Sequence, residues 1–415
     1  MTQALSNIER LARVYDPAYV HRVETLNGGS PVRVCIEGRM LNDGEGTGVS
    51  IYARTLCNCL GEAGAEALIL DNGGSHPPRS RALRWLAATR RRPRLAEALA
   101  DMPDMLIVPD LFREAQVFFN MHGRTLPVAF ENPPVVMHWT YPVPLHAVGA
   151  RNLYTIHDLI PLTHPELTPI PEQRHARILR AILERADLLV TVTEAMRTEI
   201  VERLGVDSDR VVSTWQAVEA PLQADPPLPN GIRSGRYFLF CGRVERRKNL
   251  AAIAAAHTIS GSALPLVIVG PHVPGEESLE ETLAAYPGVR RLPYLPRREL
   301  LGLMRRARAL LFPTLAEGFG LPIVEAMTLG CPVLTSDRGA TVEVAGGAAL
   351  LVDPDRSEAI AAAIGLLDRD DALCARLRAQ GFARARYFTP ERYARRLRAL
   401  YARALALPGS VEAVR

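Results

Sequence analysis

Short apolar runs that alternate with turns and helical stretches limit the fold of this chain more than any other feature. In the second half these runs are continuous instead of alternating with polar residues, which is typical of strands covered by helices on both faces. They read YFLFCG, LPLVIVG, ALLFPT and PVLTS, and helical stretches such as NLAAIAAAHTI separate them. The alternation predicts parallel sheets with helical crossovers, in which ligands bind at the carboxyl ends of the strands.

A stretch rich in proline and glycine, VEAPLQADPPLPNGIRSG, interrupts this pattern at about residues 218–235. The first half carries its own apolar runs, PVRVCIEG, AEALIL, DMLIVPD, VVMHW and NLYTIHD, after one amphipathic pattern in the first thirty residues. A chain of 415 residues exceeds what one hydrophobic core usually supports. We therefore expect two doubly wound α/β domains, at 1–220 and 236–390, facing a cleft.

Composition excludes several classes of protein. No apolar run reaches the roughly 18 residues of a membrane span, and the start lacks the apolar region of a signal peptide, so we expect a cytoplasmic chain. The net charge of +4 is mild and does not indicate nucleic-acid binding. Six scattered cysteines, without C-x-x-C spacing, indicate neither a metal site nor a disulfide framework. We expect no metal and no cofactor.

The chain contains a single lysine, Lys248, because 48 of its 49 basic residues are arginine. It lies in FCGRVERRKNL, where Gly242 and Arg243 follow a strand and a helix begins. Free backbone N–H groups, the helix dipole and two cations would converge there on an anion, with a diphosphate as the natural guest. A solvated basic turn is the alternative.

The segment EGFGLPIVE places Glu317 and Glu325 on either side of a turn. Its glycines favour a tight loop, and Pro322 suits the first position of a helix, so we expect Glu317 on the loop and Glu325 in the first helical turn. Both would face the cleft and accept hydrogen bonds from vicinal hydroxyls. The alternative is a solvated Glu317 and a Glu325 that only complements the helix dipole.

Two other strand ends carry candidate residues. LYTIHDLIPL ends a strand with His157, which could donate to a sugar or phosphate oxygen or be a structural hydrogen-bonding residue. Gly46, Thr47 and Gly48 form a glycine-rich turn that lets phosphates or an acceptor approach the backbone. Neither G-x-G-x-x-G nor a Walker A motif appears at the strand–helix junctions, which argues against hydride transfer and P-loop phosphoryl transfer.

Residues 79–100 carry seven arginines together with leucines and Trp85. Such a basic amphipathic segment is typical of contact with anionic lipid at the inner face of a membrane. A solvated helix face is the alternative.

Together these motifs resemble family-four glycosyltransferases, which are retaining enzymes of the GT-B fold. The resemblance covers residues 236–390 and 151–215, and Glu317 and Glu325 match the E-x7-E signature of the family. It implies that a helix at about 391–415 crosses back to the first domain, and that Pro390 stands where the family often has tryptophan.

The resemblance also implies a role for each site residue. His157, Glu317, Arg243 and Lys248 would be catalytic: the two cations would hold the donor diphosphate, and His157 would contact the sugar near its C6 hydroxyl. The donor site would further comprise the ribose-binding Glu325 and the loop residues Gly242, Gly318, Phe319, Gly320 and Leu321. Gly46 to Gly48 would face the phosphates or the acceptor.

The implied reaction transfers a hexose from a nucleoside diphosphate sugar with retention of configuration, and the leaving diphosphate takes the acceptor proton. The motif HDLIPL resembles enzymes of bacterial surface polysaccharide synthesis, which favours GDP-mannose as donor and a saccharide on a polyprenyl diphosphate as acceptor. A UDP-sugar transferase, a GT-B epimerase or phosphorylase, and a noncatalytic nucleotide-sugar-binding partner remain alternatives.

Overall fold

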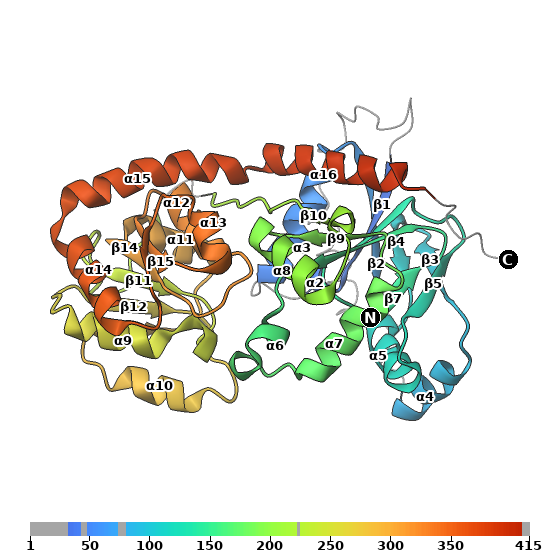
Figure 1. Cartoon of the computed structure of the whole chain (residues 1–415), viewed down its shortest axis with the longest axis horizontal. Helices are drawn as coiled ribbons and strands as arrows, with labels where there is room; N and C mark the ends of the chain where they lie inside the picture. Colours follow the sequence, from blue (N-terminus) through green and yellow to red (C-terminus); the bar gives the residue numbers. More distant parts are fainter. Residues whose placement is uncertain (1–31, 43–47, 74–79, 222–224, 409–415) are drawn as a thin grey trace.

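The computed structural model describes residues 32–42, 48–73, 80–221 and 225–408. They form two sheets, one mostly and one fully parallel, each covered by helices, and one long helical stretch runs across both (Figure 1). The expected two α/β units with parallel sheets are thus confirmed, whereas the exact domain bounds stay a prediction. The amphipathic pattern of the first thirty residues, Gly46 and Thr47 lie outside the described residues.

The first sheet has ten strands in the order β10-β9-β8-β6-β1-β2-β4-β3-β5-β7, and the pairing of β3 with β4 is antiparallel. Its centre is fully buried, and Trp139 stacks on Tyr154 with ring centroids 6.0 Å apart. The strands are β1 Val32–Glu37, β2 Ala65–Asp71, β3 Arg94–Leu99, β4 Met102–Ile107, β5 Leu126–Phe130, β6 Val136–Trp139, β7 Leu145–Ala147, β8 Arg151–Ile156, β9 Leu188–Thr191 and β10 Val211–Ser213.

Helices cover both faces of this sheet, and their ends follow local capping rules. Thr193 caps α8 by accepting a hydrogen bond from the Met196 N–H, and Gly205 ends that helix in a left-handed conformation. The helices are α2 Arg39–Asn42, α3 Gly48–Cys59, α4 Arg81–Thr89, α5 Leu111–His122, α6 Ile160–Thr163, α7 Glu172–Leu183 and α8 Glu194–Leu204.

The second sheet has six parallel strands in the order β13-β12-β11-β14-β15-β16. The order reverses between β11 and β14, so the loops that leave these two neighbours diverge and open a crevice at their carboxyl ends. The strands are β11 Phe238–Cys241, β12 Leu266–Val269, β13 Val289–Leu292, β14 Ala309–Phe312, β15 Val333–Ser336 and β16 Leu350–Val352, and the helices are α9 Leu250–Ile259, α10 Glu277–Ala284, α11 Arg297–Arg306, α12 Leu321–Thr328, α13 Gly339–Ala345 and α14 Ser357–Arg369.

Two further helices, α15 Asp371–Ala385 and α16 Pro390–Ala406, cross from the second domain to the first along the top of Figure 1. Pro390 begins α16, which packs on α3, and the Tyr401 hydroxyl lies 3.1 Å from His138 Nδ1. At this crossing the buried Phe388 meets Phe319 edge to face, with ring centroids 5.5 Å apart. Phe388 and Phe319 thus pack together beside Pro390, where the family often has tryptophan.

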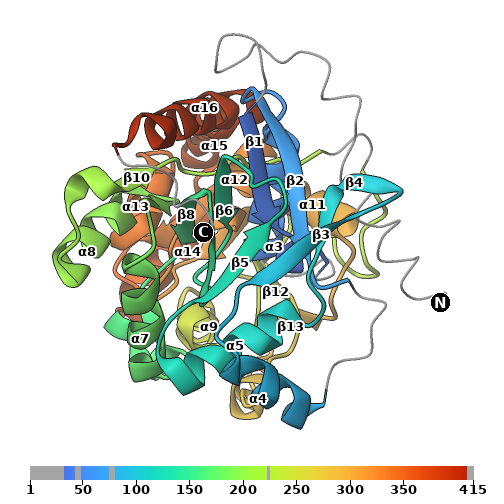
Figure 2. The same ribbon diagram turned by 90° about the vertical axis from the view of Figure 1, so that its right-hand side faces the viewer.

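The basic segment 79–100 does not form one amphipathic element. Helix α4 ends at Thr89, and after a short turn the chain becomes strand β3. Figure 2 shows α4 beside α5 at the lower end of the first domain. None of the helices in the described ranges is long and apolar enough to cross a bilayer.

Candidate functional site

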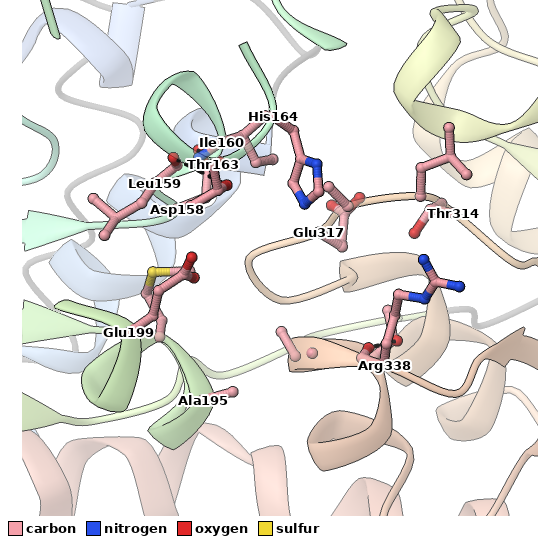
Figure 3. A pocket seen from close by; sticks show the side chains of 16 residues that line it. Asp158, Leu159, Ile160, Thr163, His164, Ala195, Glu199, Thr314, Glu317 and Arg338 are labelled. Carbon is pink, nitrogen blue, oxygen red and sulfur yellow. Dashed lines mark hydrogen bonds between the residues drawn. The ribbon is translucent and has the colours of Figure 1, made fainter. Parts of the chain in front are cut away.

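A cavity of about 310 Å³ lies between the two domains (Figure 3). The first domain lines it with the segment after β8, which includes Asp158 and His164, and with Glu199 of α8. The second domain contributes the loop after β14, with Thr314 and Glu317, and the start of α13. The carboxyl ends of strands from both sheets therefore meet at one polar cavity, where a parallel α/β sheet places its ligand.

Lys248 and Glu317 are in direct contact in the second domain. Lys248 ends a 3-10 turn after β11, Glu317 follows β14, and Nζ lies 2.7 Å from Oε2. The Arg247 guanidinium lies 2.9 Å from the same oxygen. The strand-order reversal thus brings together the single lysine and the first carboxylate of the signature, 69 residues apart in sequence.

Burial sets the electrostatics of this cluster. Burial opposes ionisation of Glu317, but the Lys248 ammonium and the Arg247 guanidinium more than offset it and hold the pKa of the carboxyl below its ordinary value. Burial lowers the pKa of Lys248, and the neighbouring Arg247 charge acts in the same direction. Arg247 also pairs with Glu245, whose Oε1 lies 2.6 Å from the arginine Nη2, and Glu245 in turn contacts Arg243. Three cations thus share two carboxylates, which leaves one excess positive charge suited to an anionic ligand.

The other basic residue of the prediction, Arg243, does not contact Glu317 and, among the described residues, joins the cluster only through Glu245. Its side chain is half-exposed and pairs with Glu245, whose Oε2 lies 3.4 Å from the arginine Nε. The sequence led us to expect that Arg243 and Lys248 hold a diphosphate together, and that expectation stays a prediction. The arginine that contacts Glu317 is Arg247, to which the sequence analysis gave no role, because no local signal distinguishes the two arginines.

Gly242, at the end of β11, is approached unusually closely by the backbone of Gly270. Its φ is 142°, and a Cβ atom built on Gly270, at the end of β12, would lie 1.8 Å from the Gly242 carbonyl oxygen. A side chain at Gly270 is therefore excluded, and Gly242 lies against the Lys248 side chain. The predicted diphosphate loop is thus held next to the buried ammonium.

Glu325 lies deeper than the sequence suggested. Helix α12 begins at Leu321, so Glu325 is its fifth residue and not part of the first turn; its side chain is only 4% exposed. Arg297 Nη2 lies 2.8 Å from Oε1 as an ion pair. Within the described residues that oxygen has no partner in hydrogen-bond alignment, so it keeps its capacity to accept a hydroxyl donor.

His157 directly follows β8, and its tautomer is defined by one hydrogen bond. Its Nε2 lies 2.7 Å from the Thr140 carbonyl oxygen, which can only accept, so Nε2 carries the proton. Burial lowers the pKa of His157, and the edge of Tyr52 packs against the ring. Neutral His157 therefore uses its N–H within the protein and keeps Nδ1 as an acceptor. Of the two roles considered for it, a structural hydrogen bond is thus present, and contact with a sugar or phosphate stays a prediction.

The loop of the signature touches the first domain directly. A Cβ atom on Gly318 would lie 2.0 Å from the His157 carbonyl oxygen, and the Thr193 hydroxyl donates to the Gly318 carbonyl over 3.2 Å. The Phe319 side chain is buried, so this residue can contact a ligand only through its backbone. Gly48, the first residue of α3, also reaches this loop, because its Cβ would lie 3.4 Å from Leu321 Cδ1.

A second contact between the domains involves Glu343 of α13. Its carboxylate accepts hydrogen bonds from the backbone N–H groups of Glu194 and Ala195 at the start of α8, over 2.8 and 2.7 Å, and from the Trp215 indole over 2.5 Å. The carboxylate thus satisfies free donors of a helix in the other domain. Sequence reasoning missed Glu343, because no local motif connects it with α8.

Thr314 adds a free polar group to the cavity wall. It is almost fully buried, and its hydroxyl has no hydrogen-bond partner among the described residues (Figure 3). Such a group is normally satisfied by a ligand or water. Among the described residues, no three His, Cys, Asp or Glu side chains cluster as metal ligands.

Comparison with known proteins assigns the chain to a class. Its fold matches that of sucrose-phosphate synthase from Thermosynechococcus elongatus, with a TM-score of 0.66 at 18% identity over 89% of this chain and 98% of that one. Anabaena HepE, solved with UDP and glucose, matches with a TM-score of 0.61 at 15% identity over 89% of this chain and 99% of that one. The protein thus has the GT-B fold of glycosyltransferases.

Sequence comparison narrows the class to a family. Residues 46–218 match Glycosyltransferase Family 4, and residues 230–384 match Glycosyl transferases group 1. The chain is 32% identical to O-antigen chain mannosyltransferase B of Escherichia coli over 256 residues. This aligned region covers 58% of this chain and 67% of that protein. It therefore belongs to the family-four glycosyltransferases, a retaining family, as the resemblance predicted.

A further relative is much longer than the chain. The serotype-specific mannosyltransferase WbdA of Escherichia coli is 26% identical over 317 residues, which cover 72% of this chain and 37% of that protein. The chain thus spans little more than a third of the length of WbdA.

Proposed function

We propose that this glycosyltransferase moves mannose from GDP-mannose to a hydroxyl of a saccharide acceptor carried on a polyprenyl diphosphate. The observation that supports a nucleoside diphosphate sugar as donor is the cluster of three cations and two carboxylates at the switch point of the second sheet, formed by Arg243, Glu245, Arg247, Lys248 and Glu317. A diphosphate is the ligand that suits its excess positive charge and the adjoining strand-end backbone. The names of two relatives, both O-antigen chain mannosyltransferases, support mannose as the sugar.

In this proposal the second domain holds the donor. Lys248, with the exposed Arg243 moving in from the surface, neutralises the diphosphate. Glu325, held by Arg297 through Oε1, accepts a hydrogen bond from a ribose hydroxyl. Glu317 and the backbone of residues 318–321 bind hydroxyls of the sugar, and the His157 Nδ1 accepts one more from the first domain.

The chemistry places charge where the protein already has positive groups. The bond between the anomeric carbon and the diphosphate oxygen breaks, the acceptor oxygen forms a new bond on the same face, and its proton passes to the leaving diphosphate. Negative charge grows on that diphosphate, and fixed cations in a cleft shielded from water stabilise it. In this scheme Glu317 and Glu325 are hydroxyl-binding groups and not an acid–base pair.

The acceptor lies on the first-domain side of the cavity. Asp158 and Glu199 line that side, and the free Thr314 hydroxyl faces it from the second domain. Carboxylates and a hydroxyl are suited to the hydroxyls of a neutral sugar, so we assign the saccharide end of the acceptor to this wall.

A thermal-shift panel tests the donor. GDP-mannose, GDP, UDP-glucose and UDP are titrated against the parent and against Lys248→Ala, and a bound ligand raises the melting temperature. We expect GDP-mannose to give the largest shift, and Lys248→Ala to lose most of it. If a UDP-sugar stabilises the parent more strongly, the donor assignment is wrong; if no nucleotide sugar does so, the donor site is wrong.

An acceptor assay separates transfer from its alternatives. Purified enzyme is incubated with donor, with and without a synthetic mannose-terminated acceptor, and free GDP and the anomeric configuration of the product are measured by NMR. We expect GDP release to depend on acceptor and the new linkage to be α. GDP release or sugar isomerisation without acceptor would point to a phosphorylase or an epimerase, and inactivity without a partner protein to a noncatalytic subunit.

A further inference from the structure

Helix α4 exposes its large apolar side chains, whereas the one buried residue among its described side chains is the small Ala88. Leu83, Trp85 and Leu86 are 54%, 57% and 56% exposed. At about 100° per residue these positions lie on one side of the helix together with Arg90. Ala88, on the opposite side, is fully buried. A surface helix normally turns its apolar side toward the core, so α4 has the reverse arrangement.

The inner face of α4 is anchored without these side chains. The helix packs on α5, and Arg84 Nε lies 3.3 Å from Asp110 Oδ2. Arg94 donates to the Ala87 carbonyl over 2.7 Å and pairs with Glu114. Ion pairs and small residues therefore hold α4 in place, and folding of the domain does not explain the exposed tryptophan and leucines.

A run of arginines follows the helix. Arg90, Arg91 and Arg92 are exposed, and no acidic side chain among the described residues forms an ion pair with them. Arg91 has a φ of 42°, a left-handed conformation uncommon for a residue with a side chain. Seven arginines and a single acid, Glu97, occur in residues 79–100. The patch is therefore both apolar and strongly basic.

We propose that α4 and the turn after it, residues 83–92, dock this protein on an anionic phospholipid surface. Trp85 with its two leucine neighbours enters the boundary between headgroups and acyl chains, and the arginines of the turn bind lipid phosphates. Charge complementarity selects this partner. A second copy of the chain would bring the same positive charge against itself, and a nucleic acid would leave the leucines unsatisfied.

The place of α4 in the fold fits this partner. Figures 1 and 2 show it at the lower end of the first domain, whereas α15 and α16 cross the top. Docking through α4 leaves those crossing helices in water and brings the first domain, to which we assign the acceptor, next to the lipid surface. The inference rests on the proposed function only where it assigns the acceptor to the first domain. Docking itself is measured without donor or acceptor.

Tryptophan fluorescence gives a direct test. Of the three tryptophans, Trp85 is exposed, Trp139 is fully buried and Trp215 is half-buried. The full-length protein is mixed with phosphatidylcholine vesicles that contain or lack phosphatidylglycerol. We expect a blue shift and co-sedimentation with the anionic vesicles only, both decreasing with added salt. Trp85→Phe should keep the co-sedimentation and lose the shift.

Matched variants locate the contact. The double variant Trp85→Ser, Leu86→Ser should reduce partitioning onto anionic vesicles by about tenfold or more. Ile259→Ser, which changes an apolar residue of α9 that is 59% exposed, should leave partitioning unchanged. Because the replaced side chains are exposed, all variants should keep the parent's melting temperature and its transfer to a water-soluble acceptor.

Three results would overturn the inference. The first is vesicle binding that survives in the double variant, the second is equal binding to neutral and anionic vesicles, and the third is an absence of binding by the parent. A change in oligomeric state that tracks Trp85 would instead identify the patch as an interface between copies. Loss of transfer in every assay together with intact vesicle binding would disprove the proposed function and leave this inference standing.

Discussion

A Cβ atom on Gly318 would lie 2.0 Å from the carbonyl oxygen of His157, so the backbones of the two domains meet more closely than any side chain allows. The obstacle is backbone and cannot rotate away. The same loop also carries Glu317, so its position against the first domain determines how the two halves of the site align.

Gly318→Ala should therefore hold the domains apart. We expect kcat/KM to fall by about 10- to 100-fold, because reacting groups that depend on precise placement become misaligned. Overpacking of this kind also costs about 1–3 kcal/mol of stability. Steady-state kinetics and denaturant unfolding measure the two effects.

Gly365→Ala is the matched control for this variant. Gly365 lies within α14, and the nearest atom to its added Cβ is the flexible end of Arg369. Alanine there should preserve activity and slightly raise stability. Equal activity of Gly318→Ala and the parent would show that the close approach has no role in the reaction.

Glu343→Ala should loosen the contact between the domains. The change removes the acceptor of two backbone N–H groups at the start of α8 and of the Trp215 indole. Loss of a comparable helix cap costs about 1 kcal/mol. Small-angle scattering should show a larger radius of gyration for the variant than for the parent without ligand, whereas Glu358→Ala, on the exposed side of α14, should leave it unchanged. An identical radius in both variants would contradict the prediction.

Lys248→Met should weaken both the fold and the donor site. Because Glu317 keeps Arg247 as a partner, we expect the free energy of unfolding to fall by about 1–3 kcal/mol, less than the cost of an isolated buried charge. Chemical unfolding of this variant, of Glu317→Gln and of the double variant gives the coupling energy of the pair. Arg246→Met changes an exposed residue of the same basic run and should be neutral. Additive effects in the cycle would argue against a functional pair.

Glu37 gives a prediction on pH. It is fully buried at the end of β1, and burial raises its pKa from 4.5 to about 8 although Thr140 and the Arg39 N–H hydrogen-bond to it. Between these two pH values the folded state holds one proton more than the unfolded state. Stability therefore falls as pH rises through this window, by at most about 1.4 kcal/mol per pH unit.

Glu37→Gln removes this titration. Between about pH 5 and 8 the unfolding free energy of the variant should depend less on pH than that of the parent, by up to about the slope given above. At the alkaline end the variant should be the more stable of the two. Urea unfolding at a series of pH values measures both. Parallel profiles of the variant and the parent would mean that Glu37 is already ionised in the folded protein.

The fold could be predicted from the sequence because the patterns that indicate its strands and helices are local. Continuous apolar runs such as Phe238–Cys241 predict buried parallel strands, and the break inside the signature segment predicted a helix that begins near Pro322. The approximate position of the crossing helix was predicted from the resemblance to the family. The basic segment around Trp85 was less clear, because a helix and an inner strand of the first sheet share it.

The contacts of the site depend on residues distant in sequence. Arg247 and Arg243 belong to one basic run, and only the turn after β11 determines which of them reaches Glu317. Arg297 lies beside Glu325 because α11 packs on α12. The proton on His157 is fixed by the Thr140 carbonyl. Periodicity and spacing carry no information about such pairings.

The helical crossing has a mechanical consequence. The chain passes between the domains twice, once after β10 and once near Phe388, and the Val218 N–H donates to the Phe388 carbonyl over 2.9 Å. The Trp215 ring contacts Tyr387 and lies under the Arg396 guanidinium, so the two passages are fastened to each other. We therefore expect the two linked passages to form a single hinge between the domains. A rotation of one domain about this hinge would move each group in proportion to its distance from the hinge, so the far rim of the cavity would open widest while Phe388 and Phe319 stay together.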